Sequence, residues 1–283
     1  MGQLSENQIQ QAKKLVSMSK MSQILENIRE VIARDRMQKQ PLILRINEGF
    51  IFNIARKAIE DKSSTFLMSI AGESASGKTT LVRNAAKACV KSDTNNVYTV
   101  ICCDDYYKDA SKELTEAGSY EKLFESGFSF DTPDAIDLEL MKEHLIKLKN
   151  GEEIYSPLYN FVTCESKKDT VLKTPAKLIL NEGLYVLHEK LRDITDVKIY
   201  VYTPFEVIKD RWFARATSRG KTGLAAQMQF HDVNQTAFRH IRPTMDMADV
   251  VINGMTTQAY IEEIVQQIIN AIVSVLRDKT CSL

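Results

Sequence analysis

The stretch Gly72-Glu-Ser-Ala-Ser-Gly-Lys-Thr79 constrains this chain more than any other feature, because it fits the pattern G-x-x-x-x-G-K-[ST] without exception. Glycines let a backbone curl so that successive N–H groups point at phosphate oxygens, and a following helix aims its positive end at the same charge. The pattern also occurs by chance as a plain glycine-rich turn. Here, however, it lies between an apolar run over 66–71 and a helical stretch from Lys78 to about Val90. The sequence therefore predicts a strand, a phosphate-binding loop and a helix in succession.

Eight residues of this loop are candidates for binding a nucleotide: Gly72, Ser74, Ala75, Ser76, Gly77, Lys78, Thr79 and Thr80. In such a loop the lysine reaches the β- and γ-phosphates, and the hydroxyl that follows it binds Mg²⁺. We therefore expect ATP and Mg²⁺ as cofactors, with Lys78 on the phosphates and Thr79 on the metal.

Segments of strand and helix character alternate along the rest of the chain. Strand candidates cover 97–102, 177–180, 197–202 and 248–252, and helix candidates cover 135–149 and about 258–276. This alternation predicts an α/β fold with a parallel sheet that has helices on both faces. The stretch 153–174 lacks a helical period and is rich in β-branched and aromatic residues, which predicts an inserted β-hairpin.

The first 64 residues have a different pattern. Apolar side chains recur at helical spacing from about Asn7 to Asp61, with a break at Pro41. We interpret residues 1–64 as a helical N-terminal extension that serves packing or oligomerisation, with a regulatory arm as the alternative, and residues 65–283 as the main domain.

Composition limits the classes of partner and the compartment. Lys and Arg together number 37, as do Asp and Glu, so there is no basic excess to indicate a nucleic-acid partner. No apolar run approaches the ~20 residues of a membrane span, which predicts no membrane partner. The five cysteines are odd in number and lack metal-ligand spacing, which favours a reducing, cytoplasmic location.

Acidic residues follow several predicted strands, where ligands gather in parallel sheets. Asp104 and Asp105 follow the strand that ends at Cys102, and only one of two such neighbours can face a site. Either could bind Mg²⁺ or accept a proton from a substrate hydroxyl, although a solvated acidic turn would have the same sequence. Glu182 follows the strand over 177–180. We expect Asp131 to bind a ligand and Asp134 to cap a helix.

Arg211, Arg215 and Arg219 recur every four residues, so a helix would align them on one face. Arginines that close over ATP would neutralise charge on the transferred phosphoryl group. A solvated helix face would have the same pattern, and we favour the lid for the group.

These segments together resemble the uridine kinase and phosphoribulokinase family of P-loop kinases. The resemblance runs from about Phe66 to the C-terminus and is strongest at the motifs 103–107, 130–137, 157–161 and 182–183. It implies that Asp104 is the catalytic base and a neighbour of Mg²⁺, and that Glu182 is the magnesium-associated acid. It also implies that Tyr107, Asp131, Tyr159 and Phe161 lie at the acceptor.

The sequence as a whole predicts an ATP-dependent kinase that phosphorylates a hydroxyl of a small molecule. Lys78, Asp104, Arg215 and Arg219 would be catalytic, Arg211 would contact substrate, and Thr79, Asp104 and Glu182 would surround the metal. A nucleoside resembling uridine or cytidine is the predicted acceptor, and the resemblance favours a homo-oligomer. Cys164 and Ser166 depart from the family's hairpin pattern, which keeps open a sugar phosphate or pantothenate-like acceptor, or an ATP-dependent switch without a small acceptor.

Overall fold

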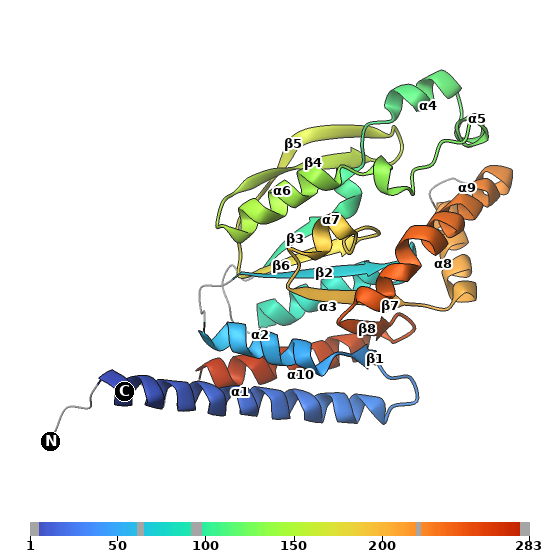
Figure 1. Cartoon of the computed structure of the whole chain (residues 1–283). Coiled ribbons are helices and arrows are strands. Elements are labelled where there is room, and N and C mark those ends of the chain that lie inside the picture. The colour runs from blue at the N-terminus through green and yellow to red at the C-terminus, as the bar shows by residue number, and fades with distance from the viewer. Residues whose placement is uncertain (1–5, 61–64, 92–97, 219–221, 278–283) are drawn as a thin grey trace.

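The computed structural model describes residues 6–60, 65–91, 98–218 and 222–277, which form an α/β fold (Figure 1). The sheet strands are β1 (Ile43–Ile46), β2 (Phe66–Gly72), β3 (Tyr98–Cys102), β6 (Leu178–Gly183), β7 (Val197–Tyr202) and β8 (Val250–Asn253). The α-helices are α1 (Glu6–Arg36), α2 (Glu48–Glu60), α3 (Lys78–Lys91), α4 (Ser111–Ala117), α5 (Tyr120–Glu125), α6 (Leu138–Lys149), α7 (Glu189–Arg192), α8 (Phe205–Ser218), α9 (Gly223–Thr236) and α10 (Gln258–Arg277).

The main sheet has the strand order β1-β8-β7-β2-β6-β3 in the described residues. β2 lies at its centre and pairs in parallel with β6 and β7, while β3 and β8 extend it on either side, also in parallel. β1 alone runs antiparallel, against β8. The predicted parallel sheet with helices on both faces is therefore confirmed.

The N-terminal region is helical as predicted, in α1 and α2, but the helical pattern is wrong at residues 43–46. This segment is β1, which pairs with β8 at Ile43↔Ile252 and Ile46↔Val250. Its apolar residues continue at helical spacing into α2, so the pattern alone did not separate them. The edge of a sheet offers unpaired N–H and C=O groups, and pairing with β8 satisfies those of β1. The boundary between residues 64 and 65 stays a prediction.

Two hydrophobic cores lie on opposite faces of the sheet. One joins buried side chains of β2, β6 and β8 to those of α1, α2, α3 and α10, including Ile28, Ile51 and Ile264. The other lies between the sheet, α6 and the region around the hairpin of β4 (Ile154–Asn160) and β5 (Glu165–Lys173), including Met141, Leu145 and Tyr185. Figure 1 shows α1 on the outer side of α2 and α10, away from the hairpin.

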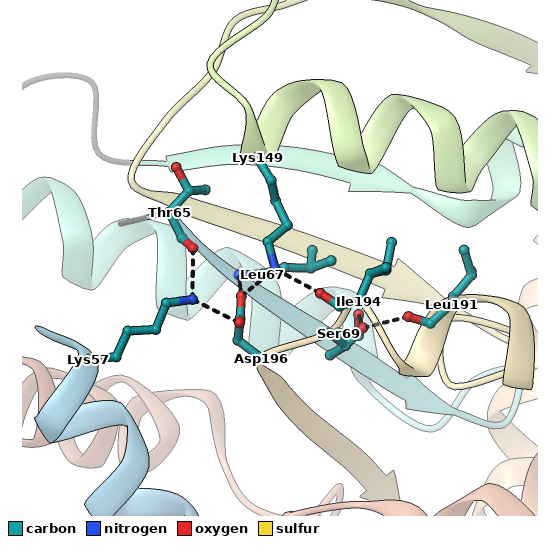
Figure 2. Close-up of polar contacts among 9 residues, drawn as sticks. Lys57, Thr65, Leu67, Ser69, Lys149, Leu191, Ile194 and Asp196 are labelled. Atoms are coloured by element: carbon teal, nitrogen blue, oxygen red, sulfur yellow. Dashed lines mark hydrogen bonds and ion pairs between the residues drawn. The ribbon is translucent and has the colours of Figure 1, made fainter. Parts of the chain in front are cut away.

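A polar junction joins both layers of helices at the start of β2 (Figure 2). Asp196 accepts hydrogen bonds from the Leu67 main-chain N–H at 2.8 Å, from Lys57 Nζ at 2.9 Å and from Lys149 Nζ at 2.9 Å. Lys57 belongs to α2 and Lys149 to α6, so Asp196 ties helices on the two faces to the central strand. Burial alone would raise the pKa of Asp196, but these three donors outweigh it and lower the pKa.

The predicted hairpin is present as β4 (Ile154–Asn160) and β5 (Glu165–Lys173), which pair antiparallel. Asp137, not Asp134, caps α6, because its carboxylate accepts the Leu140 N–H at 3.0 Å. Asp134 lies in the preceding 3₁₀ turn, Pro133–Ala135. Helices α4, α5 and α9 were not predicted. Among the described residues, no helix combines the length and the apolar character needed to cross a membrane.

Candidate active site

The predicted phosphate loop connects β2 directly to α3. Gly72 has φ of 150°, and a Cβ at this position would lie 2.7 Å from the Val201 carbonyl oxygen, so the close approach of β7 requires glycine. Ala75 has a left-handed φ of 66°, which is uncommon outside glycine and is found where a functional site fixes the backbone. The loop thus has the curled backbone that its sequence predicted.

Lys78 and Thr79 are the first residues of α3, and each contacts another part of the site. Lys78 Nζ donates to the Glu73 carbonyl oxygen at 2.9 Å. Burial lowers the pKa of Lys78, and the nearby carboxylates of Glu182 and Asp104 partly oppose this shift. The Thr79 hydroxyl donates to the Glu182 carboxylate, at 3.0 Å from Oε1 and 3.2 Å from Oε2. Burial also raises the pKa of Glu182, against the opposing charge of Lys78.

Only one carboxylate of the pair that follows β3 faces the site, as expected. Asp104 lines the cavity described below, whereas Asp105 does not. Burial raises the pKa of Asp105, and the charge of Lys173 in the hairpin opposes this shift. The pair lies in a short 3₁₀ helix, Cys103–Tyr106, which directs the two neighbouring side chains differently.

A cavity of about 820 Å³ extends from the phosphate loop to the hairpin. Fourteen of the predicted site residues line it: Ser74, Ala75, Gly77, Lys78, Thr79, Thr80, Asp104, Tyr107, Asp131, Tyr159, Phe161, Glu182, Arg211 and Arg215. Gly72 and Ser76 do not line it, because Gly72 packs against Val201 and the side chain of Ser76 is fully buried.

Aromatic side chains form another part of the cavity lining. Tyr107 lies 5.0 Å from Tyr159 and 6.0 Å from Phe161, measured between ring centroids. Burial, reinforced by the charges of Asp131 and Asp104, raises the pKa of Tyr107 well above its usual value, so its hydroxyl stays protonated. Flat apolar rings next to polar groups are typical of a site for a planar ligand.

Cys164 also lines the cavity, at the turn of the hairpin. It has a left-handed φ of 56° and is buried. The Tyr120 hydroxyl on α5 lies 3.3 Å from its thiol. Burial, with the neighbouring Cys164 thiol as a lesser cause, raises the pKa of Tyr159.

Asp131 is another acidic residue that lines the cavity. Its side chain is buried, its N–H donates to Ser129 Oγ at 3.2 Å, and its carbonyl oxygen accepts the Tyr185 hydroxyl. Main-chain contacts on both sides therefore fix the residue while its side chain lines the cavity.

Two arginines of α8 lie at the site. Arg215 Nη2 donates to Ser74 Oγ, and Arg211 Nη1 donates to the Gly254 carbonyl oxygen at 3.1 Å. Both line the cavity, which supports the interpretation of a lid for these two. Arg219 lies outside the described residues.

Several lining residues were missed by the sequence analysis. They come from α5, α8, α9, the last residue of β8 and the loop after it: Tyr120, Trp212, Gln229, Asn253, Gly254 and Thr256. They belong to no phosphate-loop pattern, and only the tertiary fold brings them to the site.

The oxygen donors at the loop fit a bound Mg²⁺. This ion is held in proteins by one or two carboxylates together with waters and substrate phosphates, and the Thr79 hydroxyl, Glu182 and Asp104 supply such groups. Across the described ranges, no cluster of three or more His, Cys, Asp or Glu side chains could hold a metal alone. The site thus suits a metal that arrives with phosphate.

The fold and the phosphate loop define a P-loop phosphotransferase. A family model described as "Phosphoribulokinase / Uridine kinase family" matches residues 67–260, so the chain belongs to this family. The resemblance noted from the motifs is thereby confirmed. The protein is an ATP-dependent phosphotransferase with a hydroxyl acceptor.

Individual relatives agree with this assignment. A uridine kinase from Borrelia turicatae is 33% identical over 189 residues, covering 66% of this chain and 85% of that protein. A uridine-cytidine kinase-like 1 protein from Mus musculus is 31% identical over 240 residues, covering 82% of this chain and 42% of that protein. The crystal structure of a protein from Silicibacter sp. TM1040, provisionally named a fructose transport system kinase, has a TM-score of 0.51 at 22% identity. It covers 65% of this chain and 87% of that chain, and shows the fold alone.

Proposed function

We propose that this protein transfers the γ-phosphate of ATP to a hydroxyl of a nucleoside, with uridine or cytidine as the acceptors of first choice. One observation carries the proposal: a single cavity is lined by the phosphate loop, by Asp104 and by the rings of Tyr107, Tyr159 and Phe161, which lie close to one another. A nucleoside has the matching shape, because a flat base is joined to a sugar that carries hydroxyls. Identity of about a third to uridine kinases supports the same acceptor class.

In this proposal each part of the site has its own task, and Asp104 serves both the metal and the acceptor. The loop from Gly72 to Thr80 and Lys78 bind the phosphates, and Thr79, Glu182 and Asp104 hold Mg²⁺, which when bound would neutralise phosphate charge. Asp104 orients the acceptor hydroxyl and takes its proton. Arg215 and Arg219 stabilise charge on the transferred group, and Arg211 contacts the substrate. Asp131 positions the sugar. Positioning and charge stabilisation account for most catalysis in phosphoryl transfer.

The test is ADP production with ATP and Mg²⁺ against a panel of nucleosides, sugar phosphates and pantothenate, with products identified by mass spectrometry. Lys78→Ala is the matched control for contaminating kinases. Phosphorylated uridine or cytidine is the expected product. Turnover on a sugar phosphate or pantothenate alone would overturn the nucleoside, and ATP hydrolysis without any phosphorylated acceptor would point to a switch.

A further inference from the structure

Glu73, the second residue of the phosphate loop, forms a two-pronged ion pair with a residue far along the chain. Arg242 Nε lies 3.0 Å from Glu73 Oε1, and Arg242 Nη2 lies 2.9 Å from Oε2. The Glu73 side chain is 12% exposed and that of Arg242 is 32% exposed. Paired hydrogen bonds between a guanidinium and a carboxylate fix geometry as well as charge.

Glu73 is also the residue that holds Lys78, because its carbonyl oxygen accepts Lys78 Nζ at 2.9 Å. The position of Glu73 therefore affects the lysine that would reach the phosphates. The Glu73 side chain does not line the cavity, but Glu73 belongs to the loop, so its carboxylate without a partner would leave an uncompensated negative charge in the segment that would bind the triphosphate. Charges of like sign repel, and this charge would weaken the binding of ATP.

Arg242 is itself held by three further elements. Its Nη2 donates to Asn234 Oδ1 of α9 at 2.7 Å, and its guanidinium lies 5.9 Å from the Phe205 ring and 6.0 Å from the Phe238 ring. It follows a π-helical turn, Ala237–Ile241, a geometry that is frequent at functional sites. Arg242 is not among the residues that line the cavity, so any effect on a ligand passes through Glu73.

We propose that Arg242 is a positioning residue for ATP: it neutralises Glu73 and thereby keeps the phosphate loop in the shape that accepts the triphosphate. This inference rests on the proposed function only in taking the loop as the ATP site. It concerns no residue that touches the acceptor, and it can be tested without knowing the acceptor.

The experiment is calorimetric titration with ATP and Mg²⁺, without acceptor, of the wild type and four variants. Arg242→Gln leaves Glu73 unpaired and is expected to raise the Kd for ATP about tenfold or more. Glu73→Gln combined with Arg242→Gln removes both charges and is expected to regain most of that loss. Arg242→Lys keeps the charge without the paired geometry, so an intermediate Kd is expected.

Arg45→Gln is the matched control. Arg45 contacts the same 3₁₀ segment, Arg242–Met247, through the Met245 carbonyl oxygen and Asp246, but it does not contact Glu73. Its variant is expected to bind ATP within about twofold of the wild type, because an exposed pair contributes little.

Three results would overturn the inference: an Arg242→Gln variant that binds ATP like the wild type, a double variant as weak as Arg242→Gln, or an equal loss in Arg45→Gln. If Arg242→Gln does not fold, the double variant is compared with Glu73→Gln alone. No further loss of affinity is then expected, and a tenfold further loss contradicts the inference. A wild type that binds no ATP would instead contradict the proposed function.

Discussion

The charge state of Lys78 depends on two nearby carboxylates. Burial lowers its pKa, and Glu182 and Asp104 act in the opposite direction. Phosphate oxygens would add negative charge beside the ammonium group. This charge would act in the same direction as the two carboxylates and favour the cationic form of Lys78. Both carboxylates line the cavity, and Glu182 also accepts a hydrogen bond from the Thr79 hydroxyl.

Asp104→Asn is expected to leave ATP binding largely intact and to reduce kcat by ~100-fold or more, the scale of lost general-base catalysis. Asn keeps the shape of the side chain but cannot accept the proton. The measurements are ADP release and ATP titration. Asp105→Asn is the control, since Asp105 does not line the cavity. Turnover within a few-fold of the wild type in Asp104→Asn would remove this residue from the role of base.

Asp196→Ala tests the junction between the two helix layers. The variant lacks the charged acceptor of three hydrogen bonds. We expect the free energy of unfolding at pH 7 to fall by about 2–3 kcal/mol. Because the pKa of Asp196 is lowered in the fold, its contribution is present above the unfolded pKa and disappears as pH falls through the lowered value. Denaturant unfolding at pH 7 and at pH 3 should show the difference shrinking. A constant difference would contradict the ionic origin.

At the scale of elements, the β4–β5 hairpin contributes to the cavity through the aromatic rings near its turn. Tyr159 is buried in β4, whereas Phe161 is 43% exposed and follows the strand, so a change of Phe161 removes less buried packing than a change of Tyr159. Its ring lies 5.1 Å from that of Tyr159.

Phe161→Ala is therefore expected to raise the KM for a nucleoside roughly tenfold, the scale of lost stacking on a base, and to leave the KM for ATP unchanged. Steady-state kinetics with each substrate varied will separate the two. Leu158→Ala, a change of a similarly exposed residue in β4 that does not line the cavity, serves as the control. An equal rise in both KM values would show that the substitution perturbs the fold as a whole and not nucleoside binding.

The elements also show where sequence reasoning succeeds. β2, β3, β6 and β7 are buried apolar runs, so composition alone predicts them. β1 has only four residues and merges into the apolar stripe of α2, so no local signal marks it as a strand. Helices α4 and α5 are seven and six residues long, too short for a clear helical period.

The candidate site divides in the same way. A phosphate loop is continuous in sequence, and its pattern alone identifies Lys78 and Thr79. The pairing of Glu73 with Arg242 spans 169 residues, and the approach of Tyr120 to Cys164 depends on how α5 packs against the hairpin. No local pattern encodes such contacts, because they arise from the topology of the sheet.

At the scale of the whole molecule, the N-terminal region is part of the core. Ile28 of α1, Ile43 of β1 and Ile51 of α2 are buried in one cluster with residues of β8 and α10. This packing bears on the predicted boundary between residues 64 and 65, because a cut there would expose an apolar surface and the edge of β8.

A chain that begins at residue 65 is therefore expected to aggregate or to melt well below the full chain, by more than ~10 °C, since many buried apolar groups lose their partners. Thermal unfolding and size-exclusion chromatography provide the measurement. A truncated chain with unchanged melting temperature and ATP binding would establish residues 1–64 as a dispensable appendage.

The antiparallel pairing of β1 with β8 has a consequence for biosynthesis. Ile43 must wait for Ile252 before this edge of the sheet can close. At ~5–20 residues per second a ribosome needs roughly 10–40 s to make the intervening chain. During that interval the apolar faces of α1 and β1 lack their final partners. The main sheet can therefore be completed only after β8 has been synthesised.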